Sequence, residues 1–147
     1  IGRIGCFLVG DCYGRPCHLP WSVTFEKGLP ATTYENFQLY YPSTFEVLVK
    51  PFYKSLDLIY VHPTQIYETI LYALIFIYLS YMRKHIKFNG MLIVEYLFLA
   101  GMSRFFIEFY RLNPKYLFNL SGAQFISLIM IFISTLIFYY KIKSSRA

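Results

Sequence analysis

Three charged residues, Arg104, Glu108 and Arg111, lie inside or at the end of an apolar stretch, spaced four and then three residues apart. On a helix, this spacing places all three side chains on one face. Ionised side chains at membrane depth are costly, so they usually face a polar cavity and carry function. Two arginines against one glutamate leave this face net positive, so we expect an anionic ligand, with phosphate the obvious one. The alternative is a structural ion pair between Arg104 and Glu108 that joins two helices.

A second polar group opens another apolar stretch, in His62-Pro-Thr-Gln65-Ile-Tyr67-Glu68. Gln65 and Glu68 are three residues apart and share a helix face. The structural alternative is that Glu68 complements the helix dipole and Gln65 caps the helix. This structural alternative does not explain why a histidine, a glutamine and a glutamate stand together. We therefore expect His62, Gln65 and Glu68 to form part of a binding site. Arg3 is a further cation in apolar surroundings, either buried or at the interface with its head in water.

The composition indicates a membrane protein with no nucleic-acid partner. Of the 147 residues, 56 % are hydrophobic and only 15 % are charged, against about 25 % charged in soluble domains. The net charge is +6, but the basic residues follow apolar runs instead of forming one patch with stacking aromatics. They include Arg83, Lys84, His85, Lys87, Lys141, Lys143 and Arg146. This is the distribution of cytoplasmic anchors beside membrane spans.

The apolar runs predict an all-α integral membrane protein, with about three full transmembrane helices in a single membrane domain, 1–147. The expected spans are residues 63–82, 90–109 and 122–140. Each has about 20 residues, or about 30 Å of helix, which matches the hydrocarbon thickness of a bilayer. Pro63 suits the first helical position of the first span.

The remaining segments predict a small region outside the membrane. Residues 1–10 are apolar and glycine-rich, which is typical of a partial or re-entrant helix. Residues 11–61 predict an irregular outer-face region with β-like runs such as 21–25. If the basic loop 83–89 is cytoplasmic, the C-terminus is cytoplasmic too, and residues 11–62 lie outside. Glu95, near the inner end of the second span, is expected to snorkel or to pack.

The three cysteines, Cys6, Cys12 and Cys17, allow several interpretations. They are small buried residues, or two of them form a disulfide on the oxidising outer face of a bacterial membrane. A zinc site completed by Asp11 or His18 is a third possibility, but the spacing matches no zinc finger or ribbon. We therefore expect no metal site and no cofactor.

Five segments follow one another in the pattern of a known family. They are Gly2-Arg-Ile-Gly-Cys-Phe-Leu-Val-Gly-Asp-Cys-Tyr-Gly-Arg15, Pro20-Trp-Ser-Val, His62-Pro-Thr-Gln-Ile-Tyr-Glu68, Arg104-Phe-Phe-Ile-Glu-Phe-Tyr-Arg111 and Gln124-Phe-Ile-Ser127. In this order, and over nearly the whole chain, they resemble the prolipoprotein diacylglyceryl transferase family. The resemblance implies an integral protein of the bacterial inner membrane. It would move the diacylglyceryl group of phosphatidylglycerol onto the lipobox cysteine thiol of a preprolipoprotein and release glycerol phosphate. The implied partners are phosphatidylglycerol, the prolipoprotein signal peptide and membrane lipids.

The resemblance also implies roles for single residues. Arg3 and Arg104 match arginines that bind the lipid phosphate, and Glu108 matches a glutamate that pairs with this arginine face. The expected substrate-binding residues are Arg3, Arg104, Arg111, Gln65, Glu68 and Gly14. Thiol attack on the glycerol carbon needs a base for the thiol proton and cations for the departing phosphate. The candidate catalytic residues are His62, Asp11, which stands where the family has glutamate, and Glu108.

The sequence also differs from the family pattern. Cys6 replaces the signature asparagine, and Ala100 stands where the family has a tyrosine, four residues before Arg104. The family's N-terminal helices with their His-Gly-Gly block are absent, and the first residue is Ile1, so we expect a fragment or a shortened paralogue; no signal peptide is visible. The alternative function is a phospholipid-binding membrane component that kept the anion site and lost the chemistry. A thiol or metal function of the cysteines is a third hypothesis.

Overall fold

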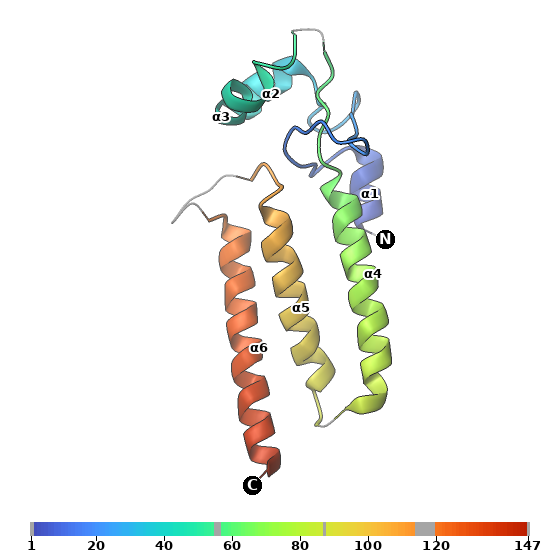
Figure 1. Ribbon diagram of the computed structural model, residues 1–147, viewed down its shortest axis with the longest axis vertical. Helices are drawn as coiled ribbons and strands as arrows, with labels where there is room; N and C mark the ends of the chain where they lie inside the picture. The colour runs from blue at the N-terminus through green and yellow to red at the C-terminus, as the bar shows by residue number, and fades with distance from the viewer. Residues whose placement is uncertain (1, 55–56, 87, 114–119, 147) are drawn as a thin grey trace. The chain divides into compact units, whose positions relative to one another are not determined.

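The computed structural model describes residues 2–54, 57–86, 88–113 and 120–146 (Figure 1). It contains helices and isolated β-bridges, and it divides into two compact units. The first unit consists of Ile1–Thr69 with Tyr110–Leu112, and the second of Ile70–Phe109 with Asn113–Ala147. The single membrane domain expected from the sequence stays a prediction.

The first unit begins with α1, Gly2–Val9, which agrees with the helical segment expected there. Gly10 ends this helix in the left-handed conformation, with φ +70°. The amide of Gly10 donates to Phe7 O at 3.2 Å, and the amide of Asp11 donates to Cys6 O at 2.9 Å. This pair of bonds is the Schellman motif, in which a glycine terminates a helix and satisfies its last carbonyls. Asp11 is thereby placed directly at the end of α1.

Residues 11–61 form short helices and loops. The helices are α2, Tyr34–Tyr40, α3, Pro42–Thr44, and the π-helix η1, Phe45–Val49. The Thr33 side chain caps α2 by accepting from the amide of Asn36. In the expected β-like run 21–25, only an isolated antiparallel bridge between Val23 and Val61 forms within the described residues. The irregular character expected for this region is therefore observed.

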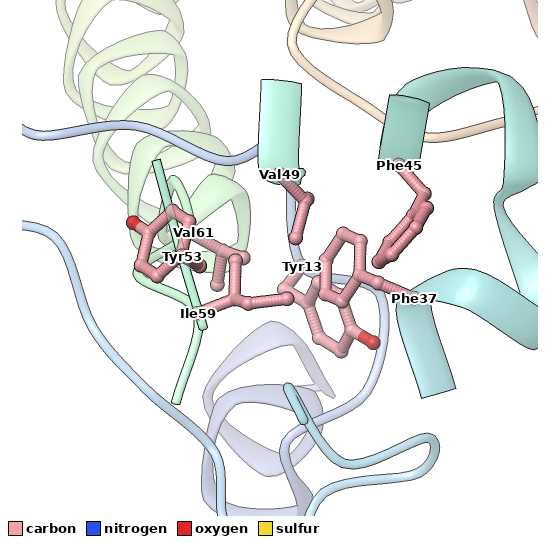
Figure 2. Packing of buried hydrophobic residues seen from close by; sticks show 7 residues of the cluster. All are labelled: Tyr13, Phe37, Phe45, Val49, Tyr53, Ile59 and Val61. Carbon is pink, nitrogen blue, oxygen red and sulfur yellow. The ribbon is translucent and has the colours of Figure 1, made fainter. Parts of the chain in front are cut away.

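An aromatic and aliphatic core holds this region together (Figure 2). Its buried members are Tyr13, Phe37, Phe45, Val49, Tyr53, Ile59 and Val61. The ring of Tyr13 stacks on Phe37 with centroids 6.0 Å apart. Burying side chains of this size stabilises a fold by about 1.5–3 kcal/mol each. Tyr13 and Val61 thus fix two stretches of backbone, near residues 11–16 and 60–62, that reach the site described below.

Three long helices follow: α4, Thr64–Met82, α5, Met91–Glu108, and α6, Gly122–Arg146. The helices expected at 63–82, 90–109 and 122–140 are confirmed as helices, although α6 continues further than predicted. Two helical segments, Thr64–His85 and Gly122–Lys141, are long and apolar enough to cross a membrane. A crossing by α5, which carries three charged residues, stays a prediction.

The short loop after α4 is basic and exposed. It starts with the 3₁₀ helix η2, Arg83–His85, whose three side chains are all exposed. Exposed cations at the end of an apolar helix are suited to a membrane–water interface. Lys87, the fourth member of the expected basic cluster, lies outside the described residues.

In the second unit, α5 packs along α6 (Figure 1), and small residues are buried on both helices. A Cβ atom built on Gly101 would lie 3.0 Å from Ile131 Cγ1 and 3.1 Å from Ser127 O. Ser103, Ser127 and Ser134 are buried, and each hydroxyl donates to a carbonyl of its own helix. Small residues that allow close backbone approach are typical of helix contacts in membranes.

The end of α5 corrects one prediction. The helix ends at Glu108, and Phe109 bonds back to Phe106 O at 3.2 Å in a tighter turn. Arg111 is therefore not on the helix face that carries Arg104 and Glu108. It forms an isolated antiparallel bridge with Gly14 in the first unit. The prediction of a three-residue ladder on one helix face is wrong for Arg111, because the helical spacing stops before it.

Candidate functional site

The first unit contains a cluster of two arginines on one buried carboxylate. The Nε atom of Arg3, on α1, forms an ion pair with Glu68 of α4. Nη1 of Arg111 lies 3.7 Å from Oε1 of the same glutamate. The Glu68 side chain is 3 % exposed and that of Arg111 is 8 % exposed, whereas Arg3 is 30 % exposed. A buried carboxylate requires such partners, because its desolvation is costly. Within the described part of the first unit, two guanidinium groups thus contact this carboxylate, and Arg3 is the most accessible of the three residues.

The first turn of α4 holds the loop that follows α1. The Gln65 side-chain amide donates to Asp11 O at 2.5 Å, and the Thr64 hydroxyl donates to Cys12 O at 2.8 Å. Cys12 adopts a left-handed backbone with φ 60°, which costs a non-glycine residue about 1–2 kcal/mol. These two bonds oppose that cost and fix the loop beside the ion cluster. Gln65 thus has an observed positioning role, and its contact with a substrate stays a prediction.

Gly14 lies where three segments of the first unit meet. Its amide donates to His62 O at 2.9 Å, and it bridges Arg111. A Cβ atom at this position would lie 2.6 Å from Tyr110 O, 2.7 Å from Thr64 Cγ2 and 2.8 Å from His62 Cβ. Only glycine fits this space without displacing backbone. Gly14, expected to bind substrate, therefore has a packing role that brings Arg111 and His62 close to one another.

His62 stands at the end of a chain of hydrogen-bonding side chains. Its Nδ1 atom lies 3.2 Å from the Tyr67 hydroxyl, which accepts a hydrogen bond from Trp21 Nε1 at 2.9 Å. The ring of Tyr110 contacts His62 edge to face, with centroids 5.3 Å apart. Burial lowers the pKa of His62 from its ordinary value of 6.5, because it disfavours the charged ring. His62 is therefore neutral at pH 7.

The cysteines are free thiols, each partly buried. Burial raises the pKa of the Cys12 thiol, and the nearby Asp11 carboxylate raises it further, although nearby Arg111 opposes the shift. Burial also raises the pKa of Cys17. Both groups are thus protonated thiols at pH 7. Across the described ranges, no three histidine, cysteine or acidic side chains come together to hold a metal ion.

The second unit contains the other acidic candidate, Glu108. It is buried at the end of α5, and its Oε1 atom accepts hydrogen bonds from Ser121 Oγ at 2.7 Å and Asn113 Nδ2 at 2.6 Å. These donors hold the carboxylate in place. Arg104 lies one turn earlier on α5 and is partly buried, and Ala100 is buried one turn before that.

Of the two roles expected for Glu95, snorkelling or packing, the structure agrees with packing. Its Oε2 atom is buried and has no hydrogen-bond partner among the described residues. The side chain lines a cavity of about 320 Å³ with Val94 and Phe98 of α5 and Ser134 of α6. A snorkelling glutamate would place this oxygen in water, so that interpretation is wrong.

The structure groups the predicted site residues by unit. The first unit contains Arg3, Asp11, Gly14, His62, Gln65, Glu68 and Arg111, and the second contains Arg104 and Glu108. Sequence reasoning did not single out Thr64, Trp21, Ser121 and Asn113 as partners of these residues. Trp21 stands within a family segment, but no local spacing relates it to residue 67.

Two helices of membrane-crossing length and an arginine–carboxylate cluster are features expected of a helical membrane protein with a basic polar site. Residues 1–140 match the family described as prolipoprotein diacylglyceryl transferase. The chain belongs to this family, whose members are bacterial membrane proteins of lipoprotein biosynthesis.

Curated relatives agree with this assignment. The chain is 37 % identical over 139 residues to a phosphatidylglycerol–prolipoprotein diacylglyceryl transferase of Clostridium tetani. The aligned residues cover 93 % of this chain and 46 % of that relative. A protein of the same name in Clostridioides difficile is 34 % identical, over 88 % of this chain and 40 % of the relative. Another in Finegoldia magna is 33 % identical, over 89 % of this chain and 41 % of the relative. The chain thus spans less than half the length of these relatives. No solved structure matches it.

Proposed function

We propose that this protein transfers the diacylglyceryl group of phosphatidylglycerol to the lipobox cysteine thiol of a prolipoprotein. Family membership supports the reaction class. The single observation that supports it best within the chain is the pair of arginines on Glu68. Such a cluster keeps its arginines ordered in the absence of substrate, and its guanidinium groups can donate to an anion.

Arg3, Arg111 and Arg104 are the proposed phosphate ligands. Guanidinium groups match the geometry of phosphate oxygens and stay charged under all conditions. Arg3 is the most exposed arginine of the first unit's cluster and so the one most open to a headgroup. Glu68 orients Arg3 and Arg111, and Gln65 orients the loop at Asp11.

The proposed chemistry is a nucleophilic displacement at the glycerol carbon. The substrate thiol loses its proton to a base and forms the carbon–sulfur bond, while the carbon–oxygen bond to phosphate breaks and glycerol phosphate leaves. Arginines stabilise the negative charge that develops on the leaving group. Asp11, His62 and Glu108 are the candidate bases. The lipid and the signal peptide of the prolipoprotein are the proposed partners.

The proposed topology places the site at the outer face of the bacterial inner membrane. The exposed cations Arg83 and Lys84, together with exposed Lys141 and Lys143 of α6, favour the cytoplasm. If α5 also crosses, Arg104 lies in the outer half of the bilayer, about 20 Å along the helix from its cytoplasmic start. The C-terminus is then cytoplasmic.

The test is transfer from labelled phosphatidylglycerol to a lipobox peptide in vesicles, with any sequence that precedes Ile1 in the gene retained. We expect Arg3→Gln to lower the transfer rate by about 10- to 150-fold, since a hydrogen bond to a charged group contributes about 1.5–3 kcal/mol. Arg83→Gln is the matched control, because Arg83 is exposed in the loop after α4. Equal rates for the two variants would remove Arg3 from the site.

The second candidate function is binding of phosphatidylglycerol without turnover. Ala100 favours it, because a methyl group stands where the family has a tyrosine hydroxyl, and the position is buried. Cys6 in place of asparagine favours it too. Native mass spectrometry that shows bound phosphatidylglycerol, together with no labelled peptide after prolonged incubation, would support this function over transfer.

A further inference from the structure

Trp21, Tyr67 and His62 form a connected hydrogen-bond chain within the first unit. Trp21 comes from the loop after α1, Tyr67 from the first turn of α4, and His62 directly precedes that helix. Trp21 Nε1 lies 2.9 Å from the Tyr67 oxygen, which lies 3.2 Å from His62 Nδ1. The ring of Tyr110 packs edge to face on both His62 and Tyr67.

The chemistry of the three groups fixes the direction of the first bond and favours one direction for the second. An indole N–H can only donate, so the Tyr67 oxygen accepts from Trp21. Tyr67 has one proton of its own, and His62 Nδ1 is the neighbour that can accept it. We infer that Trp21 and Tyr67 hold neutral His62 in the tautomer that carries its proton on Nε2.

The surroundings of His62 support a fixed, neutral ring. Its amide donates to Arg15 O at 3.1 Å, and its carbonyl accepts from Gly14, so the backbone is held on both sides. Burial lowers its pKa. The titratable side chains next to the ring are Tyr67 and Tyr110, and Cys17 lies near Tyr67. Within the part of the chain that the structure describes, Nε2 makes no hydrogen bond.

The consequence for chemistry rests on the proposed function. With Nδ1 occupied by Tyr67, the free edge of His62 presents an N–H donor and no lone pair. Such a donor stabilises negative charge on a phosphate oxygen, whereas it cannot accept the proton of an incoming thiol. The inference therefore removes His62 from the candidate bases named above and leaves the carboxylates, of which Asp11 lies in the same unit. Tyr67 and Trp21 are therefore positioning residues for His62.

Nitrogen NMR of the histidine rings tests the tautomer directly. The full protein, labelled with ¹⁵N-histidine in detergent micelles at pH 8, has three histidines, and His62→Gln identifies the resonances of His62. We expect a protonated Nε2 and an unprotonated, hydrogen-bonded Nδ1. Tyr67→Phe removes the donor and should lower the Nε2–H to Nδ1–H ratio about five-fold, the effect of one hydrogen bond of typical net strength. Trp21→Phe should shift the ratio in the same direction by less.

Tyr78→Phe is the matched control. It removes the same hydroxyl from the same helix at an exposed position, so the resonances of His62 should not change. A wild-type ring protonated on Nδ1 would overturn the inference, since Tyr67 would then accept from both neighbours. An unchanged ratio in Tyr67→Phe would overturn it as well.

Two substitutions of His62 separate the donor role from a base role. The glutamine in His62→Gln retains an amide N–H near the position of Nε2 but cannot act as a base, and His62→Leu retains neither function. We expect the glutamine variant to transfer at least about ten times faster than the leucine variant. Equal loss in both would overturn the donor role. If the wild-type protein has the Nε2–H tautomer but transfers no diacylglyceryl group, the proposed function is contradicted. The tautomer assignment would still stand.

Discussion

Substitution of Gly14 by alanine should disrupt the site through one added methyl group. The new Cβ would lie 2.6 Å from the carbonyl oxygen of Tyr110. That carbonyl cannot easily retreat, because it accepts from the amide of Arg15 at 2.8 Å. The other close neighbours are Thr64 and His62, which are themselves fixed by hydrogen bonds. The strain must therefore be relieved by movement of backbone.

The expected cost follows from these contacts. Overpacking a tight site usually destabilises a protein by about 1–3 kcal/mol. A loss of about 2 kcal/mol corresponds to a fall in Tm of about 4–8 °C for a chain of this size. The measurement is thermal unfolding of the purified protein in detergent, with transfer activity measured on the same sample. Activity should fall too, because relief of the contact moves His62 and the bridge to Arg111.

Gly122→Ala is the matched control for this prediction. A Cβ atom on Gly122 has no neighbour within 4 Å, and alanine favours helix over glycine by about 1 kcal/mol. Its Tm should stay equal to that of the wild type or rise slightly. If Gly14→Ala unfolds at the same temperature as Gly122→Ala, the close approach of the three segments is refuted.

Four further predictions concern single groups. Glu68→Gln should destabilise the protein by roughly 3–5 kcal/mol, because Arg111 stays buried without its carboxylate; a loss below about 1 kcal/mol in denaturant unfolding would contradict this. The pKa of His62 is lowered in the folded state, so the unfolded chain binds that proton more readily. Stability should fall as the pH drops through about 6.5 towards the folded pKa, and His62→Gln should flatten this part of the stability profile. Glu95→Leu should raise Tm, since a buried carboxylate oxygen that has no hydrogen-bond partner among the described residues destabilises by about 1–3 kcal/mol; a lower Tm would contradict this. A reporter that works only in the cytoplasm should be active when fused after the C-terminus, and a reporter that works only outside should be inactive there. The reverse result would invert the proposed topology.

The sequence predicted the long helices well. Apolar runs of membrane length place α4, α5 and α6 within about two residues at their starts, because Pro63, Gly90 and Gly122 mark where each run begins. Periodicity failed where the helix ended. Arg111 follows Glu108 at helical spacing, but the chain leaves the helix between them, and pattern alone does not show that exit.

The contacts of the site could not be predicted from spacing. Arg3 and Glu68 were both expected to be functional, yet they are 65 positions apart and their ion pair depends on how α1 meets α4. The same holds for Trp21 and Tyr67, whose bond joins a loop to a helix. Residue type indicated which side chains need a partner, and only the fold determines which partner each one has.

The bridge between Gly14 and Arg111 has a consequence for biosynthesis. The first unit takes almost all of its chain from the N-terminal half, but it also needs the three residues 110–112. These leave the ribosome only after all of α4 and α5 has been made. Because domains assemble as the chain emerges from its N-terminus, Glu68 can meet Arg3 early, whereas Arg111 joins the pair about 40 residues later. A nascent chain halted before residue 110 would thus contain Glu68 and Arg3 without Arg111, and Arg111 would be the last of these three residues to be made.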